Sequence, residues 1–142
     1  MGRRRVVLDT SVVVAALRSR QGASFHLISL LEQERFEAAI SVPLLFEYED
    51  VLLRYLDAGL YTQENVDDFL DYLCQAAHRQ SIFFLWRPCL SDSKDDMVLE
   101  LAVAASCEAI VTHNVRDFAG TDHFGVGVYA PKDFLRSLEE RK

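Results

Sequence analysis

Short runs of apolar, mostly β-branched residues alternate along this chain with longer segments that carry a helical pattern. The runs lack the polar alternation of a sheet with one wet face, so each strand is expected to be covered on both sides. The predicted strands are Arg5–Asp9, Phe36–Ser41, Ile82–Leu85, Ala109–Thr112 and Val126–Tyr129. This alternation predicts a three-layer α/β/α sandwich around a mostly parallel five-stranded sheet.

The segments between the predicted strands carry recognisable helix starts. Pro43 suits the first turn of one helix, and Thr62 suits the cap position of another. The predicted helices are Thr10–Leu17, Ser24–Glu34, Pro43–Leu56, Gln63–Gln80, Ser93–Ser106 and Pro131–Glu140. No repeat or Pro/Gly-rich linker divides the 142 residues, so a single domain over residues 1–142 is expected.

Composition excludes several classes of protein. With 50% hydrophobic residues the chain can bury a core, which argues against disorder. The longest apolar runs, such as Val12–Leu17, fall far short of the roughly 20 residues that cross a bilayer. The basic start has no signal-peptide stretch after it, and Cys74, Cys89 and Cys107 are too widely spaced for a zinc or redox motif. We therefore expect a cytoplasmic protein that does not contact membranes.

The net charge of −7 argues against nonspecific binding of nucleic acid, because phosphates require positive patches. An acidic protein can still act on a polyanion where metal ions neutralise an acidic cleft. Ligands of parallel α/β sheets bind beyond the carboxyl ends of the strands, so that edge is where chemistry is expected.

Asp9 is the first candidate at that edge, because it directly follows a buried strand. A carboxylate there is costly to desolvate unless something pairs with it. Two interpretations remain open from this residue alone. It either caps the next helix, with Thr10 and Ser11 sharing that work, or it binds a metal ion.

Glu47 is the second candidate. It borders the apolar stripe of the Pro43–Leu56 helix, which comprises Leu44, Tyr48, Val51, Leu52 and Tyr55. A carboxylate there is placed to face a cleft, although an isolated Glu47 would more simply be a boundary residue.

Asp96 is the third candidate, in the first turn of a helix, on the same face as Leu99. A favourable interaction with the helix dipole explains an outward acid there better than it explains an inward one.

The fourth candidate region follows the Ala109–Thr112 strand. Asn114 and Asp117 offer oxygen ligands, and Arg116 can contact a phosphate or pair with an acid. A polar turn capped by Asn and Asp is the alternative. Oxygen ligands without clustered His or Cys select hard ions, chiefly Mg²⁺ or Mn²⁺.

Four ordered motifs resemble those of the PIN-domain family, over roughly residues 5–135. They are Val7-Leu8-Asp9-Thr10-Ser11-Val12, the Ser41–Tyr48 segment, the Asp92–Ala102 segment and the Ile110–Phe118 segment. Within that family the chain most resembles the prokaryotic toxin components of toxin–antitoxin pairs related to the VapC ribonucleases.

The resemblance implies a sheet of strand order 3-2-1-4-5 and a metal-dependent endoribonuclease. It assigns the catalytic and metal-binding acids to Asp9, Glu47 and Asp96, with Asp117 as an outer contributor. It also implies an RNA substrate, a homodimer and a small antitoxin that blocks the site. Thr10, Ser11, Thr112, Asn114 and Arg116 are the expected residues for substrate or metal-bound water.

The chain departs from the family pattern at three positions. Many relatives have Asp where Asn114 stands, Gly where His113 stands and Pro where Ser93 stands. With Asn114 in place of Asp, one metal contact is expected to be weaker, and Asp117 is then the main candidate for the fourth ligand.

Other functions remain open at this level. They include RNA processing or flap cleavage of DNA by a nuclease of the same fold, and a noncatalytic module that binds a small regulatory protein. A phosphatase with an aspartate nucleophile ranks low, because such enzymes need a second Asp where Ser11 stands. The Arg3–Arg5 run either guides the nucleic-acid backbone or is a solvated charge run.

Overall fold

Five parallel strands form the centre of the molecule. The computed structural model describes residues 3–81 and 93–140. The strands are β1 (Arg5–Leu8), β2 (Glu37–Ile40), β3 (His78–Arg79), β4 (Ala109–Val111) and β5 (Gly127–Tyr129). Their order is β3-β2-β1-β4-β5, and every neighbouring pair is parallel. The predicted α/β class is confirmed, and so is the strand order that the family resemblance implies.

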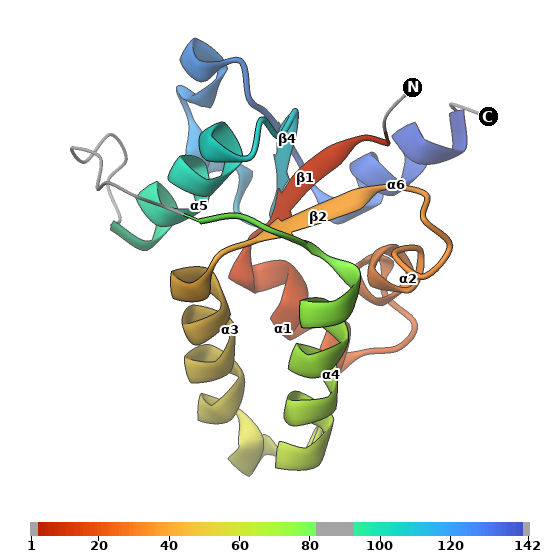
Figure 1. Cartoon of the computed structure of the whole chain (residues 1–142). Coiled ribbons are helices and arrows are strands. Elements are labelled where there is room, and N and C mark those ends of the chain that lie inside the picture. The colour runs from red at the N-terminus through yellow and green to blue at the C-terminus, as the bar shows by residue number, and fades with distance from the viewer. Residues whose placement is uncertain (1–2, 82–92, 141–142) are drawn as a thin grey trace.

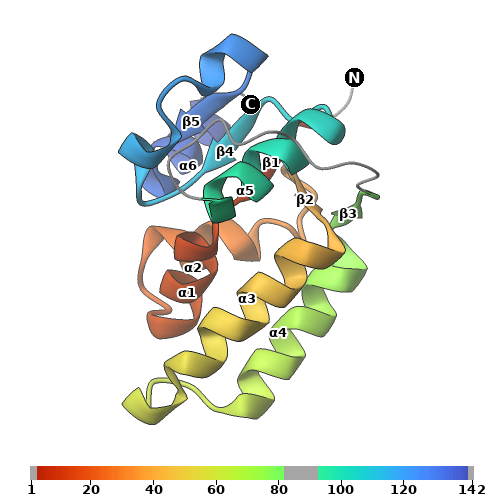
Figure 2. The same ribbon diagram turned by 90° about the vertical axis from the view of Figure 1, so that its left-hand side faces the viewer.

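Helices cover both faces of this sheet, as Figure 1 shows. The helices are α1 (Thr10–Arg18), α2 (Ala23–Ser29), α3 (Val42–Arg54), α4 (Gln63–Ala76), α5 (Ser93–Ala104) and α6 (Pro131–Glu140). Helix α5 lies on one side of the central strands, and α1 lies on the other. Helices α3 and α4 run side by side and project away from the sheet (Figure 2). No helix in residues 3–81 or 93–140 is long and apolar enough to cross a bilayer.

The third strand differs from the prediction. The predicted strand Ile82–Leu85 lies outside the described residues, and β3 consists of His78 and Arg79, which the prediction assigned to the preceding helix. That helix ends at Ala76, because Ala77 is already extended (φ −93°, ψ 158°). The chain then pairs with β2, and the Gln80 N–H donates to the Ile40 carbonyl over 2.9 Å. Pairing with an open sheet edge therefore ends the helix early.

Two other helices are shorter than predicted, because turns interrupt them. Helix α2 ends at Ser29, and the chain reverses through Glu34, which has a positive φ of 55°, before β2. Helix α3 ends at Arg54 and is followed by the short 3₁₀ helix η1 (Leu56–Ala58), which Gly59 closes at φ 76°. Tyr55, predicted in the apolar stripe, is therefore 43% exposed.

The predicted start of α4 is confirmed. The Thr62 hydroxyl accepts the Asn65 N–H over 3.1 Å, and the Asn65 side chain accepts the Thr62 N–H over 2.9 Å. This reciprocal pair satisfies two of the donors that a helix start leaves open.

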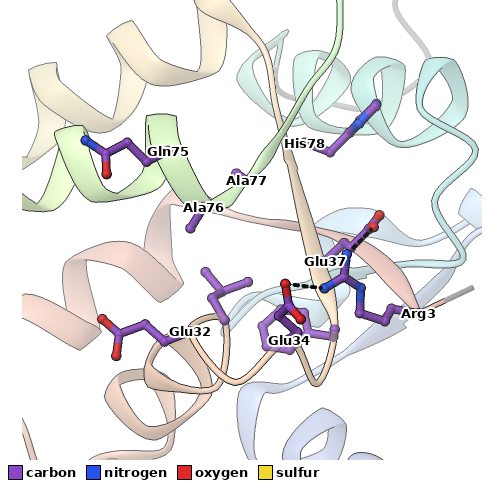
Figure 3. Close-up of a pocket in the computed structure, with 10 residues that line it drawn as sticks. Arg3, Glu32, Glu34, Glu37, Gln75, Ala76, Ala77 and His78 are labelled. Carbon is purple, nitrogen blue, oxygen red and sulfur yellow. Dashed lines mark hydrogen bonds and ion pairs between the residues drawn. The ribbon is translucent and has the colours of Figure 1, made fainter.

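The basic residues at the amino end of β1 form ion pairs. Arg5 Nε lies 2.9 Å from a Glu37 carboxylate oxygen, and Arg4 Nε lies 2.7 Å from Glu108. Arg3 pairs with Glu34 and Glu37 at the border of a pocket of about 410 Å³ (Figure 3). Because Arg3 and Arg4 precede β1 and Arg5 begins it, while Asp9 follows it, the arginines lie at the opposite edge of the sheet. The ion pairs of Arg4 and Arg5 argue against a purely solvated charge run, and the role of the run as a guide for nucleic acid stays a prediction.

We expect Glu37→Gln to lower the free energy of unfolding at pH 7 by about 0.5–1 kcal/mol, because Glu37 is only partly exposed and pairs with two arginines. The hydrogen bond from Arg5, opposed by burial and helped by the charges of Arg5 and Arg3, holds the pKa of Glu37 below its ordinary value. A lowered folded pKa stabilises the fold above the unfolded pKa, and the effect is lost as pH falls through the folded value.

Urea unfolding of wild type and Glu37→Gln at pH 7 and below about pH 4 checks this expectation. The difference between the two proteins should shrink at the lower pH. Glu34→Gln is the control, because Glu34 is far more exposed and should change stability little. An equal loss in both variants would show that the Glu37 pairs do not anchor this edge.

Candidate active site at the carboxyl edge of the sheet

Asp9 is the best-defined polar group at the carboxyl edge. Its backbone N–H donates to the Val111 carbonyl over 2.8 Å, so the β1–β4 ladder fixes its position. Its side chain is buried, with 8% exposure, and one carboxylate oxygen, Oδ2, accepts two hydrogen bonds. Ser11 Oγ donates over 2.8 Å, and Thr112 Oγ1 donates over 2.7 Å. The carboxylate is therefore held between the first turn of α1 and the end of β4.

The two hydroxyls are themselves oriented by the backbone beyond β4. The His113 N–H donates to Ser11 Oγ over 3.1 Å, and the Asn114 N–H donates to Thr112 Oγ1 over 2.9 Å. Each hydroxyl thus accepts a hydrogen bond from a backbone N–H and donates one to Asp9 Oδ2. Hydrogen bonds in such a chain polarise one another, which strengthens the hold on the carboxylate.

This geometry argues against one of the two interpretations of Asp9, the helix cap. Asp9 occupies the cap position of α1, but its side chain makes no cap hydrogen bond to the helix. The hydroxyls instead use one oxygen, and none of the described residues donates a hydrogen bond to the other, Oδ1. A carboxylate that is fixed on one side and open to a ligand on the other suits a metal ligand better than a helix cap.

Glu47 enters the edge from the second turn of α3, as its place beside the apolar stripe predicted. Its side chain is only 10% exposed, and Oε2 lies 3.6 Å from Lys94 Nζ. The neighbouring Tyr48 is buried, and its hydroxyl donates to the Leu8 carbonyl, the last residue of β1. Burial, with a smaller contribution from the charge of Asp9, raises the pKa of Tyr48 above its ordinary value. Tyr48 therefore ties α3 to the strand that carries Asp9.

Asp96 lies in the first turn of α5 and is half-buried, with Oδ2 shielded from solvent. The Lys94–Glu47 pair brings this turn against α3. The amino ends of α1, α3 and α5 follow or face the carboxyl ends of the strands, so their dipoles favour negative charge at this edge.

The fourth predicted region is more exposed. Asn114, Arg116 and Asp117 all have exposed side chains, and Asp117 lies in the 3₁₀ helix η2 (Val115–Phe118). Asn114 makes no side-chain cap bond, although its carbonyl accepts the Asp117 N–H over 3.0 Å. Thr10, the first residue of α1, is half-buried beside Asp9. The Asn114–Asp117 turn thus supports the hydrogen bonds around Asp9 only through the Asn114 N–H, which donates to Thr112 Oγ1, and none of its side chains joins them.

The donor chemistry of this edge fits a hard divalent cation, because it consists of carboxylate and hydroxyl oxygens. The positions of the acidic side chains fit such an ion less well. Within the ranges 3–81 and 93–140, no three His, Cys, Asp or Glu side chains lie close enough together to hold one metal ion. Of the four predicted acids, Asp9 is fixed by two hydrogen bonds. Glu47 pairs with Lys94, in the turn of α5 that carries Asp96, and Asp117 lies in the exposed η2 turn.

Sequence reasoning missed two contacts at this edge. It did not single out Lys94, although Lys94 stands two residues before Asp96. It also treated His113 as a surface residue. The His113 ring is exposed, but it contacts the buried Ser24 hydroxyl, with 2.9 Å between Nε2 and Oγ. Helical spacing signals neither contact, because both join elements that are distant in sequence.

A family model described as the PIN domain matches residues 5–116 of the chain. This chain belongs to the PIN-domain family. PIN domains are generally nucleases, and these nucleases generally use divalent metal ions. No curated protein compared with the chain matches it.

The fold is also similar to that of a solved structure. The crystal structure of VapBC2 from Rickettsia felis bound to a DNA fragment from their promoter aligns with a TM-score of 0.57 at 16% identity. The alignment covers 88% of this chain and 98% of that chain. At this identity the similarity supports the fold of the PIN domain alone.

We expect Thr112→Val to lower the free energy of unfolding by about 1.5–3 kcal/mol, because it removes a charge-assisted hydrogen bond to the buried Asp9 carboxylate. Thr121→Val is a matched control, since Thr121 is equally buried but donates to a neutral carbonyl, that of Val126, over 3.0 Å. Its loss should be about 0.5–1.5 kcal/mol. Denaturant unfolding of both variants measures the difference, and equal losses would contradict the anchoring role of Thr112.

Proposed function

We propose that this PIN domain is a metal-dependent endoribonuclease that acts as the toxin of a toxin–antitoxin pair in the cytoplasm. The observation that carries the proposal is the buried Asp9 carboxylate, which two hydroxyls fix through Oδ2 instead of letting it cap α1. Burying a charge costs stability, so a buried carboxylate at this edge supports a role in binding a ligand. The family match supports nuclease chemistry at the same edge.

In the proposed reaction, Asp9, Glu47 and Asp96 hold Mg²⁺ or Mn²⁺, directly or through its waters. A bound divalent ion supplies an activated water and offsets negative charge on the leaving oxygen. Ser11 and Thr112 keep the Asp9 carboxylate in one orientation, so this ligand needs no reorganisation during the reaction.

The exposed turn after β4 serves the substrate in this proposal. Asn114 and Asp117 orient water or a second ion, and the exposed Arg116 guanidinium contacts a backbone phosphate. Thr10, the first residue of α1, would hydrogen-bond a substrate oxygen or a water of the metal ion in this proposal. No covalent intermediate between enzyme and RNA is required.

A protein partner is supported by the apolar surface of α3. Val42 and Phe46 are 65% and 66% exposed, and Leu53 on the same helix is also exposed. Beside them, Leu70 and Cys74 of α4 help to line a pocket of about 190 Å³. Exposed apolar faces of this kind mark sites of protein interaction. We propose that they serve the small antitoxin and the homodimer that the family resemblance implies.

Asp9→Asn tests the proposed function. The substitution removes one negative charge at nearly constant volume, so cleavage of RNA with Mn²⁺ should fall at least about 100-fold, equivalent to about 2.7 kcal/mol of transition-state stabilisation. The variant should also lose the growth arrest expected when the wild-type chain is expressed without its antitoxin. The control is Asp57→Asn, at the exposed end of the α3–α4 pair, which should behave as wild type.

Cleavage by Asp9→Asn at the wild-type rate would contradict the assignment of Asp9. A panel of single-stranded RNA, structured RNA and flapped DNA separates the candidate substrates. Activity confined to structured RNA or to flapped DNA would replace the toxin proposal with RNA processing or flap cleavage of DNA by the same site.

A second candidate function is a noncatalytic module that binds a small regulatory protein. The net charge of −7 favours it, because a basic tail can neutralise an acidic edge. Two purified-protein results together would support it. They are no metal-dependent cleavage of any substrate in the panel and tight binding of a basic peptide that Asp9→Asn weakens.

A further inference from the structure

Lys94 supplies a positive charge to the acidic edge. Its Nζ lies 3.6 Å from Glu47 Oε2, at the point where the first turn of α5 meets α3. The two side chains differ in environment, because Glu47 is 10% exposed and Lys94 is 54% exposed. A carboxylate withdrawn this far from water is stabilised by a nearby cation, and Lys94 provides one.

A divalent ion bound to the Glu47 carboxylate would be repelled by the Lys94 ammonium. Two cations that share one carboxylate within a few ångströms repel each other, and the repulsion is stronger where water is partly excluded. A lysine can resolve the conflict, because its ammonium is a compact charge on a flexible four-carbon stem. The half-exposed position of Lys94 leaves solvent into which the ammonium can swing.

We propose that Lys94 is a tethered cation that holds Glu47 and competes with the divalent ion for it. Its withdrawal from Glu47 accompanies metal binding, so Lys94 sets the metal affinity of the site. This inference rests on the proposed metal-dependent function. It makes Lys94 a positioning residue for Glu47 rather than a catalytic residue.

Mn²⁺ titration of the purified chain by calorimetry tests the inference. Lys94→Met should bind Mn²⁺ about three- to tenfold more tightly than wild type, because the competing charge is gone. Lys94→Arg retains the charge and should bind nearly as wild type does. Arg54→Met is the matched control, because it also removes a cation paired with an acid of α3, Asp50, far from the edge.

Thermal unfolding provides a second readout that a purely structural role would not reproduce. Without Mn²⁺, Lys94→Met should melt at a lower temperature than wild type, because Glu47 has lost a cation. With saturating Mn²⁺ it should gain more than wild type gains. Lys94→Gln repeats both measurements with a polar side chain, in case Met perturbs the fold.

The possible outcomes separate this inference from the proposed function. In the first outcome, wild type binds Mn²⁺ and Asp9→Asn abolishes that binding, but Lys94→Met and Lys94→Gln bind Mn²⁺ no more tightly than wild type. This result overturns the role of Lys94 and leaves the metal proposal intact. Absence of Mn²⁺ binding by wild type and both Lys94 variants overturns both. Tighter binding by the Lys94 variants but not by Arg54→Met supports the competition.

Discussion

The carboxylate of Asp9, clamped between the hydroxyls of Ser11 and Thr112, is the interaction on which the candidate site depends. It joins two neighbouring strands at the edge where their carboxyl ends meet, because Ser11 follows β1 and Thr112 follows β4. The strand pairing already fixes the backbone on both sides, so forming these hydrogen bonds costs little additional conformational entropy. A buried charge held this firmly is a feature that stability alone does not require.

Helix packing positions two of the other acids, Glu47 and Asp96. Tyr48 connects α3 to the end of β1 through the Leu8 carbonyl, which holds the neighbouring Glu47 at the same edge. Lys94 then connects α5 to Glu47, which holds the turn that carries Asp96. Basic side chains lie at both edges of the sheet. Arg3, Arg4 and Arg5 close the amino edge in ion pairs, whereas Lys94 faces the acids of the carboxyl edge.

Local patterns in the sequence were sufficient for the class of fold and for the elements with strong end signals. The apolar run before Asp9 and the Thr62 cap each correspond to an observed element boundary, since they depend on neighbours within a few residues. The ends set by distant pairing were not predictable. His78 and Arg79 leave the helical pattern because the edge of β2 offers hydrogen bonds, and no local residue signals this.

For the candidate site, too, local sequence patterns were informative and contacts between distant residues were not predictable. Residue type and position after a strand singled out Asp9, and helical spacing placed Glu47 beside the core. That Asp9 does not cap α1 could be seen only in the structure, because its carboxylate is held by Thr112, which lies far away in sequence. The Lys94–Glu47 pair likewise joins α5 to α3 and has no signature in either helix.

The central claim is that the carboxyl edge around Asp9 is a divalent-metal site. The most direct measurement is a crystal structure of the chain grown with Mn²⁺, in which anomalous scattering locates the ion. We predict a Mn²⁺ ion bound to Asp9, with Glu47 and Asp96 as direct or water-mediated ligands and Lys94 displaced from Glu47. Mn²⁺ bound only elsewhere, with Asp9 still held by Ser11 and Thr112 and unliganded, would contradict the account.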